Sequence, residues 1–196
     1  MAGAPLLVTP EPERPRPGAI APREGIHQRN LADASGVDDQ EFYKRLSGEV
    51  AKGVAILSTT HRGRDYAATV TDYLSVSFDP PTMLVSIYSL SRLAEAIESA
   101  GRWSLSVLSS AQAAVADGLG EPGAPLIGLL DQIPHSRRDA SAPPIVDGAL
   151  AWFELRTVDS FTAATHTIFV GEVAWLGRPA EHRARPLVRF RSSYST

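Results

Sequence analysis

Hydroxyl side chains are concentrated in one stretch of the chain, between residues 69 and 91. They are Thr69, Thr71, Ser75, Ser77, Ser86, Ser89 and Ser91. In the segment Ser89–Arg92, two hydroxyls, an arginine and the first N–H groups of an expected helix lie together. Hydroxyls and free N–H groups at strand ends and helix starts can bind a phosphate without a lysine. The alternative, that serine and threonine are simply common in strands and caps, is equally well supported by these residues alone.

A second candidate is His166, which precedes the apolar segment Thr167–Trp175. This segment is predicted to be a strand, and alternation puts His166 on the same face as Ile168 and Val170. The imidazole is then either a working group at the mouth of a site or the polar end of a core strand. No histidine lies three or four residues from another, so we expect no metal site.

Several classes of function are disfavoured by what the sequence lacks. There is no G-x-G-x-x-G after a strand, no G-x-x-x-x-G-K-[ST] and no H-E-x-x-H, which argues against a Rossmann domain, a P-loop and a zincin. The absence of cysteine excludes thiol chemistry and permits a reducing compartment. A net charge of -3 argues against nucleic-acid and membrane-surface partners. With no 18-residue apolar run and no secretory signal pattern, we expect a cytoplasmic protein.

The elements that must position these residues begin after a proline-rich start. Residues 1–37 hold six of the 15 prolines and cannot bury enough apolar surface to offset their ordering entropy. We expect 1–37 to be a largely disordered arm, or an arm laid on a partner subunit. The remaining residues, 38–196, are long enough for one domain with a hydrophobic core.

The pattern of residues 38–196 predicts a mainly β domain. A helix is expected from Asp38, which has Glu41 at the capping-box spacing, to Gly53. Two further helices are expected at 90–101, capped by Ser91 and Gly101, and at 111–120. Strands are expected at 54–60, 66–71, 82–88, 102–108, 148–161 and 166–176, with a last short segment at 185–194. Without any βαβ alternation, this order favours an antiparallel barrel with short helices packed outside.

Six segments in this order resemble the flavin reductase family, the small components that supply reduced flavin to two-component monooxygenases. The segments are 53–59, 67–87, 102–112, 143–158, 166–173 and 186–194. The most specific is AATVTDYLSVSFDPPTMLVSI, where a T-x-T strand end is followed by S-V-S, D-P-P and an apolar strand. The resemblance covers roughly residues 40–194.

The resemblance implies a fold and an activity. The fold would be an FMN-binding split β-barrel, Greek-key-like, forming a homodimer with flavin in a groove near the interface. The activity would be hydride transfer from NADH or NADPH to FMN or FAD, followed by release of reduced flavin to a flavin-dependent monooxygenase. The protein would chiefly position the two rings, because the cofactors carry the redox chemistry. The segment 118–144 would be a lid over the nicotinamide.

The same resemblance implies roles for individual residues. The flavin ring would lie against Thr69, Val70 and Thr71, and His166 would be the catalytic-site histidine that meets the nicotinamide. The phosphate and ribityl chain would be held by Ser75, Ser77, Ser89, Leu90, Ser91 and Arg92. Ser106, Phe190 and Tyr194 would lie near the pocket.

Two departures from the family pattern bear on these roles. The family's glycine and aspartate before the histidine are Ala164 and Thr165 here, and Ser106 replaces an asparagine able to hold two partners. Three alternatives therefore stay open: a flavin-binding accessory protein without reductase activity, a split-barrel flavoenzyme with its own organic substrate, and a non-enzymatic interaction module. The residues do not separate FMN from FAD, or NADH from NADPH.

Overall fold

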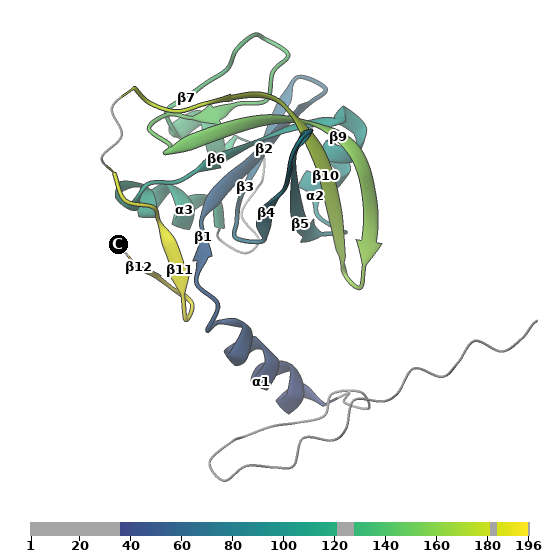
Figure 1. The fold of residues 1–196 in the computed structure, drawn as a ribbon, viewed down its shortest axis with the longest axis vertical. Helices are drawn as coiled ribbons and strands as arrows, with labels where there is room; N and C mark the ends of the chain where they lie inside the picture. Colours follow the sequence, from purple (N-terminus) through teal and green to yellow (C-terminus); the bar gives the residue numbers. More distant parts are fainter. Residues whose placement is uncertain (1–35, 121–127, 181–183, 196) are drawn as a thin grey trace, which may run out of the picture. The chain divides into compact units, whose positions relative to one another are not determined.

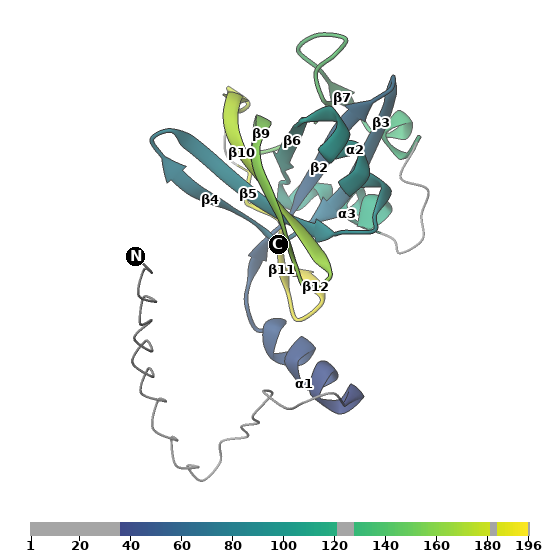
Figure 2. The same ribbon diagram turned by 90° about the vertical axis from the view of Figure 1, so that its right-hand side faces the viewer.

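The computed structural model describes residues 36–120, 128–180 and 184–195 (Figures 1 and 2). The proline-rich arm expected at 1–37 lies almost wholly outside these residues. The chain divides into two compact units, Met1–Glu41 and Phe42–Thr196, and the second unit contains all of the strands. No helix within the described ranges is long and apolar enough to cross a membrane.

Helix α1, Val37–Ser47, is shorter than the sequence predicts. Gly48 follows its last residue, and glycine disfavours helix by about 1 kcal/mol relative to alanine. No side chain of α1 is buried, so packing does not offset that cost. Gly53 does not end the helix but belongs to strand β1, Lys52–Gly53. There it leaves room for Tyr73, since a Cβ on Gly53 would lie 2.7 Å from the tyrosine hydroxyl oxygen.

The fold is built on one antiparallel sheet of seven strands, in the order β3-β2-β6-β9-β10-β5-β4. The strands are β2 Ala55–His61, β3 Arg64–Val70, β4 Tyr73–Phe78, β5 Pro81–Tyr88, β6 Arg102–Val107, β9 Ala151–Ala163 and β10 His166–Gly177. Figures 1 and 2 show the sheet curling strongly, with the β9–β10 hairpin crossing over the barrel. The mainly β split barrel expected from the sequence is confirmed.

Strand β4 was not separated from its surroundings in the sequence. Its residues do alternate, but the apolar ones, Leu74, Val76 and Phe78, point to the surface and not to the core. β4 pairs with β5 and forms one edge of the sheet. Pro80 and Pro81 lie at the hairpin turn, as expected for residues that cannot donate to a ladder.

Two apolar clusters lie on opposite faces of β2. Alternation sends Ala55 and Leu57 into the barrel interior and Val54 and Ile56 into the outer cluster. The interior cluster is closed by helix α2, Arg92–Ala100, through Leu93, Ala94 and Ile97. The outer cluster is covered by helix α3, Ala113–Gly120, through Ala116 and Leu119. Because β2 is buried on both faces, it is the central strand of the domain.

Helix α2 has the caps that its sequence predicts. The Ser91 hydroxyl accepts a hydrogen bond from the Ala94 N–H at 3.1 Å, and Gly101, at φ 65°, donates its N–H to the Ile97 carbonyl at 2.8 Å. The helix therefore begins three residues after β5 ends at Tyr88. This short connection holds the Ser89–Arg92 segment at the end of the barrel strands.

The remaining elements are short. A three-stranded sheet joins β1 to β11 (Val188–Phe190) and β12 (Ser193–Ser195). The 3-10 turn η1 (Ser110–Gln112) leads into α3. The described part of segment 118–144 is not irregular throughout, since it contains the 3-10 turn η2 (Leu129–Gln132) and strand β7 (His135–Ser136), which pairs with β8 (Ile145–Val146). Residues 121–127 of the expected lid lie outside the described residues.

Candidate functional site

A cavity of about 280 Å³ opens where β3, β5, the start of α2 and the start of β10 meet. We call it the His166 cavity. It is lined by Ala68, Thr69, Val70, Thr71, Asp72, Ser86, Ile87, Tyr88, Ser91, Leu93 and His166. Its size is at the lower end of ligand pockets, which span roughly 300 to 1,000 Å³. Of the residues predicted from the sequence, the structure brings Thr69, Val70, Thr71, Ser91 and His166 together here.

The wall formed by residues 69–71 is the end of an edge strand. β3 pairs only with β2 in the sheet, so the N–H groups that face away from β2 have no ladder partner. The Thr69 hydroxyl is already engaged, donating to the Ala116 carbonyl of α3 at 2.7 Å. This segment can therefore offer backbone N–H groups, more than side chains, to an electronegative atom of a ligand.

Three hydroxyls remain available on the cavity wall. Among the residues described, the side chains of Thr71 and Ser86 make no hydrogen bond. The Ser91 oxygen accepts from Ala94, which leaves its O–H free to donate. Neutral donors of this kind suit a polar, uncharged heterocycle and its hydroxylated chain. Elsewhere in the described part of the chain, no three His, Cys, Asp or Glu side chains converge in a way that could hold a metal ion.

His166 is exposed at the rim of the cavity and is held from two sides. Its Nδ1 lies 3.0 Å from the Thr165 hydroxyl oxygen. Its ring meets the edge of the Tyr88 ring, with centroids 6.1 Å apart and planes at 70°. This contact follows from the sheet register, which pairs His166 of β10 with Tyr88 of β5. Nε2 is left to face a ligand, as donor or acceptor according to the tautomer.

The turn that carries His166 is tied to the turn that starts α2. Ala164 and Thr165 connect β9 to β10, and Ala164 adopts φ 53°, a conformation that favours glycine. The Thr165 carbonyl accepts from the Ser89 N–H at 3.0 Å. The Thr167 hydroxyl donates to the Ser89 hydroxyl at 2.9 Å. Ser89 thus connects the two turns but does not itself line the cavity.

The other residues predicted from the β4 and α2 segments lie away from the His166 cavity. Ser75 and Ser77 are on β4, and the Ser77 hydroxyl is bonded to the backbone of Asp79. Leu90 is 83% exposed, and Arg92 lines a different cavity. Their roles in holding a phosphate or ribityl chain stay predictions.

Ser106, Phe190 and Tyr194 also lie apart from the cavity. Ser106 is buried and accepts from the Val146 N–H at 3.0 Å, so its oxygen fastens β6 to β8. The Phe190 ring lies under the Arg191 guanidinium, 5.0 Å from its centroid. Tyr194 packs against the outer cluster, and burial together with nearby Asp117 raises the pKa of its hydroxyl. The proximity of these three residues to a ligand stays a prediction.

Two cavity residues were missed in the sequence. Tyr88 contacts His166 only because of the β5–β10 register, which no local pattern reveals. Asp72 lies just beyond the T-x-T strand end, where its carboxylate pairs with the Lys52 ammonium at 2.5 Å and its carbonyl accepts from the Ser86 N–H at 2.8 Å. Its position directly after Thr71 was the available signal.

A curled antiparallel sheet with an open, hydroxyl-lined cavity at its strand ends defines the class of flavin-binding split barrels. The chain belongs to the family of flavin reductase like domains, whose model matches residues 47–196. It is 29% identical to the NADH-dependent flavin reductase StyB of Pseudomonas fluorescens, over 80% of this chain and 89% of that protein.

Two further comparisons agree with the family. The chain is 32% identical to the reductase component of a 4-nitrophenol 4-monooxygenase/4-nitrocatechol 2-monooxygenase from Rhodococcus opacus, over 69% of this chain and 70% of that protein. Among solved structures, it resembles a homologue of nitrilotriacetate monooxygenase component B from Mycobacterium thermoresistibile, with a TM-score of 0.75 and 28% identity. That match covers 81% of this chain and 86% of the other.

Proposed function

We propose that the protein is an NADH-dependent flavin reductase, an NAD(P)H:flavin oxidoreductase of EC 1.5.1 type, that delivers reduced FMN or FAD to a flavin-dependent monooxygenase. The observation that carries the proposal is the His166 cavity, where the ends of three barrel strands and the start of α2 meet in a chain of this family. The relatives named as NADH-dependent reductases and monooxygenase components support the choice of reductant and partner.

The groups on the cavity wall fit a flavin ring. Free N–H groups along Thr69–Thr71 can donate to ring oxygens and nitrogens, and such donors stabilise negative charge where it develops. Thr71, Ser86 and Ser91 add hydroxyls without adding charge. Bound flavin would supply the hydride acceptor and the nicotinamide would supply the hydride, so this chain has to hold both rings and exclude misaligned poses.

His166 is assigned to the nicotinamide side of the cavity. It lies at the exposed rim, and its Nε2 is free while Nδ1 contacts Thr165. A neutral imidazole nitrogen can bond to an amide such as that of nicotinamide. Hydride transfer requires no proton from this histidine, so its role is to orient the ring and not to act as a base.

The test is steady-state oxidation of NADH and NADPH, each with FMN, FAD and riboflavin. We expect oxidation that depends on added flavin and is faster with NADH than with NADPH. Absence of oxidation with every pair would reject the reductase assignment.

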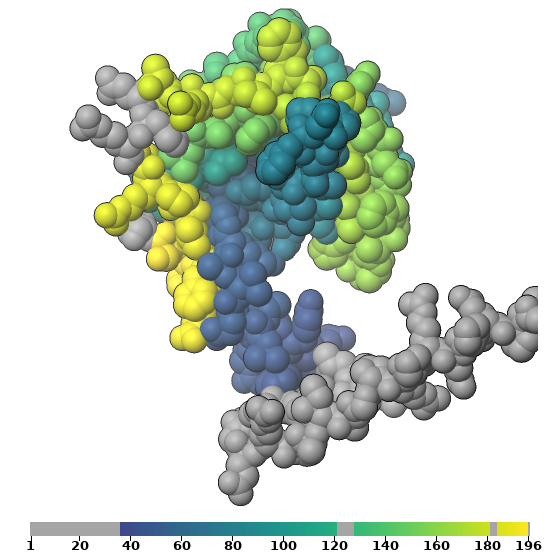
Figure 3. Space-filling view, viewed as in Figure 1, coloured from purple at the N-terminus to yellow at the C-terminus, as the bar shows by residue number. Residues whose placement is uncertain are grey.

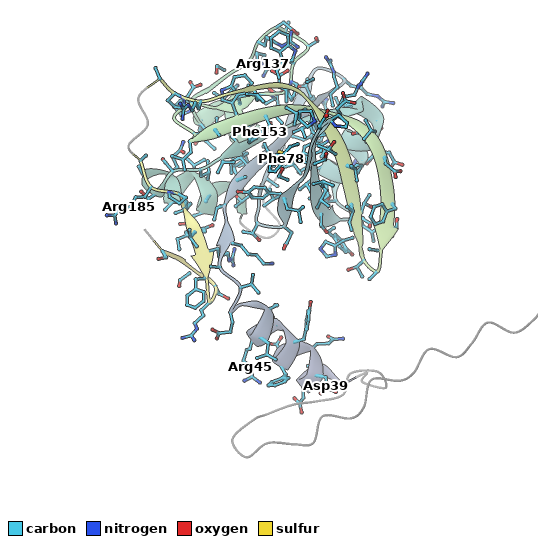
Figure 4. All side chains as sticks on the ribbon, in the orientation of Figure 1. Asp39, Arg45, Phe78, Arg137, Phe153 and Arg185 are labelled. Carbon is cyan, nitrogen blue, oxygen red and sulfur yellow. The ribbon has the colours of Figure 1, made fainter. Side chains whose placement is uncertain are left out.

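A homodimer is the second part of the proposal. The edge strand β4 exposes Leu74, Val76 and Phe78, the last at 92%, and an apolar edge strand left open invites pairing with another chain. Figure 3 shows this hairpin standing at the surface, and Figure 4 labels Phe78 on it. We expect light scattering to give twice the chain mass, and Phe78→Asp to lower it toward one chain mass.

One observation favours a second candidate, a flavin-binding accessory protein without reductase activity. Thr165 stands where the family places an aspartate before the histidine, and a hydroxyl holds an imidazole less firmly than a carboxylate does. Anaerobic addition of NADH to the protein with FMN separates the two candidates, since bleaching of the flavin band requires reduction. A protein that stays yellow through purification would instead favour a flavoenzyme with its own substrate. The cytoplasmic location remains a prediction.

A further inference from the structure

A second cavity, of about 380 Å³, lies on the other side of the first turn of α2. We call it the arginine cavity. It is lined by His61, Arg62, Arg64, Tyr66, Arg92, Glu95 and Ala96. Three guanidinium groups face one carboxylate, so the cavity is cationic. None of these residues except Arg92 belongs to the site predicted from the sequence.

The cations of this cavity are not neutralised by the protein. Within the described residues, Arg62 and Arg64 make no ion pair and no side-chain hydrogen bond. Arg92 reaches Glu95 only at 4.0 Å, and both side chains are more than 70% exposed, so that pair contributes little. By contrast, Arg137 is paired with Asp65 and Arg191 with Glu49. A cluster of unpaired guanidinium groups favours a polyanionic ligand, and guanidinium recognises phosphate by paired hydrogen bonds.

A tight hairpin turn presents two of the arginines. His61 pairs with Arg64, and the two residues between them, Arg62 and Gly63, have φ values of 50° and 71°. Two positive φ values define the two-residue turn that matches the twist of a hairpin, and asparagine or glycine is the usual first residue. Arginine at this position is a costly choice for the turn alone, so its side chain is the feature that needs a reason.

The arginine cavity is continuous with the His166 cavity along β3. Arg64 and Tyr66 line the first, and Ala68 and Val70, on the same face of the strand, line the second. Arg64 and Ala68 are roughly 13 Å apart at the rise of an antiparallel strand. At the start of α2, Ser91 lines the His166 cavity and the next residue, Arg92, lines the arginine cavity. A single extended ligand can therefore occupy both.

We propose that the arginine cavity binds the adenosine diphosphate group of a dinucleotide whose redox ring lies in the His166 cavity. The ring placement rests on the proposed function, whereas the cation cluster does not. Arg62, Arg64 and Arg92 would bind the two phosphates, and Tyr66 would give the nucleoside an aromatic surface. Both FAD and NADH carry this group, and FMN and riboflavin lack it.

The test compares Arg62→Asn/Arg64→Gln with the wild type by calorimetric titration of ADP. Asparagine keeps the left-handed turn, so the double variant removes two charges and retains the hairpin. Arg178→Gln, which changes an exposed arginine outside both cavities, is the matched control. We expect the Kd for ADP to rise at least about ten-fold in the double variant and to stay unchanged in the control. Circular dichroism melting checks that both variants fold.

Two further arms identify the dinucleotide. Fluorescence titration of FAD and of FMN shows whether the double variant loses FAD affinity selectively, and titration of NADH tests the nicotinamide source in the same way. A selective loss for either dinucleotide supports the proposal and names its ligand. Equal ADP, FAD and NADH affinities in variant and wild type would overturn it. Because ADP binding is measured without turnover, this result stands apart from the reductase test, which fails only if no flavin is reduced.

Discussion

The hydroxyl of Thr165 lies 3.0 Å from Nδ1 of His166, so a neutral side chain holds the imidazole where the family pattern has a carboxylate. The second support is the Tyr88 ring, which contacts the imidazole at its edge. Threonine can fix the direction of the ring through one hydrogen bond, but it adds no negative charge that would favour a cationic imidazole. The residue therefore suits a histidine that orients a ligand and does not carry a proton.

We expect His166→Ala to raise the KM for NADH by on the order of ten-fold, as the loss of one or two hydrogen bonds predicts. The Kd for FMN should change much less, because the flavin is assigned to the 69–71 wall. Steady-state kinetics and fluorescence titration measure the two effects. Thr165→Val, which removes only the support of the ring, should show a smaller rise. Unchanged NADH kinetics in His166→Ala would contradict the assignment.

Changing Ser89 and Ser91 together to alanine should weaken FMN more than riboflavin, because only FMN carries a phosphate. Ser91 also caps α2, and losing such a cap costs about 1 kcal/mol of unfolding free energy. Ser91→Thr keeps a capping hydroxyl and serves as the control for stability. Urea unfolding separates the cap from the ligand effect, and an equal loss of both flavins would remove the phosphate assignment.

Gly171→Ala should destabilise the domain by about 2 kcal/mol, because a Cβ there has no room. It would lie 2.7 Å from Cζ2 of Trp103 and 2.9 Å from Cβ of Leu155, both in the barrel core. Gly118→Ala is the matched control, since a Cβ on this helical glycine meets nothing within 4 Å. We expect the control to be neutral or more stable. Chemical denaturation of both variants makes the comparison, and equal stabilities would show that the core yields at Gly171.

Arg138→Ala should destabilise the fold by about 2 to 3 kcal/mol, because it removes the cation beside a buried carboxylate. Glu154 is only 5% exposed, its Oε2 lies 3.4 Å from Arg138 Nε, and its Oε1 has no partner among the described residues. In a Glu154→Gln background the same change should cost markedly less, since no charge is then stranded. A double-mutant cycle in urea measures the coupling, and additive effects would show that the pair contributes nothing.

The parts of the fold that depend on local signals were predictable. Ser91 and Gly101 are neighbours in sequence of the helix they cap, so both caps followed from residue type. The end of α1 and the existence of β4 were missed for one reason: each depends on whether an apolar side chain finds a core. Leu46 and Leu74 fit an amphipathic pattern, yet both are more than half exposed.

The site divides along the same line. The resemblance grouped Thr69–Thr71, Ser91 and His166, and the structure joins them in one cavity. Ser106 looked equivalent in sequence, but alternation on β6 turns its hydroxyl toward β8. Tyr88 could be recognised only once the register of β5 against β10 was known. Which face a side chain takes is a property of the sheet and not of the segment.

The two hydrogen bonds that join Ser89 to Thr165 and Thr167 make the α2 turn and the His166 turn one mechanical unit. A molecule that orders one turn pays part of the entropy for ordering the other. Occupancy on the α2 side would then strengthen binding beside His166, and by thermodynamic reciprocity the effect runs equally in the opposite direction. Two different small molecules would thus show heterotropic cooperativity across a single serine.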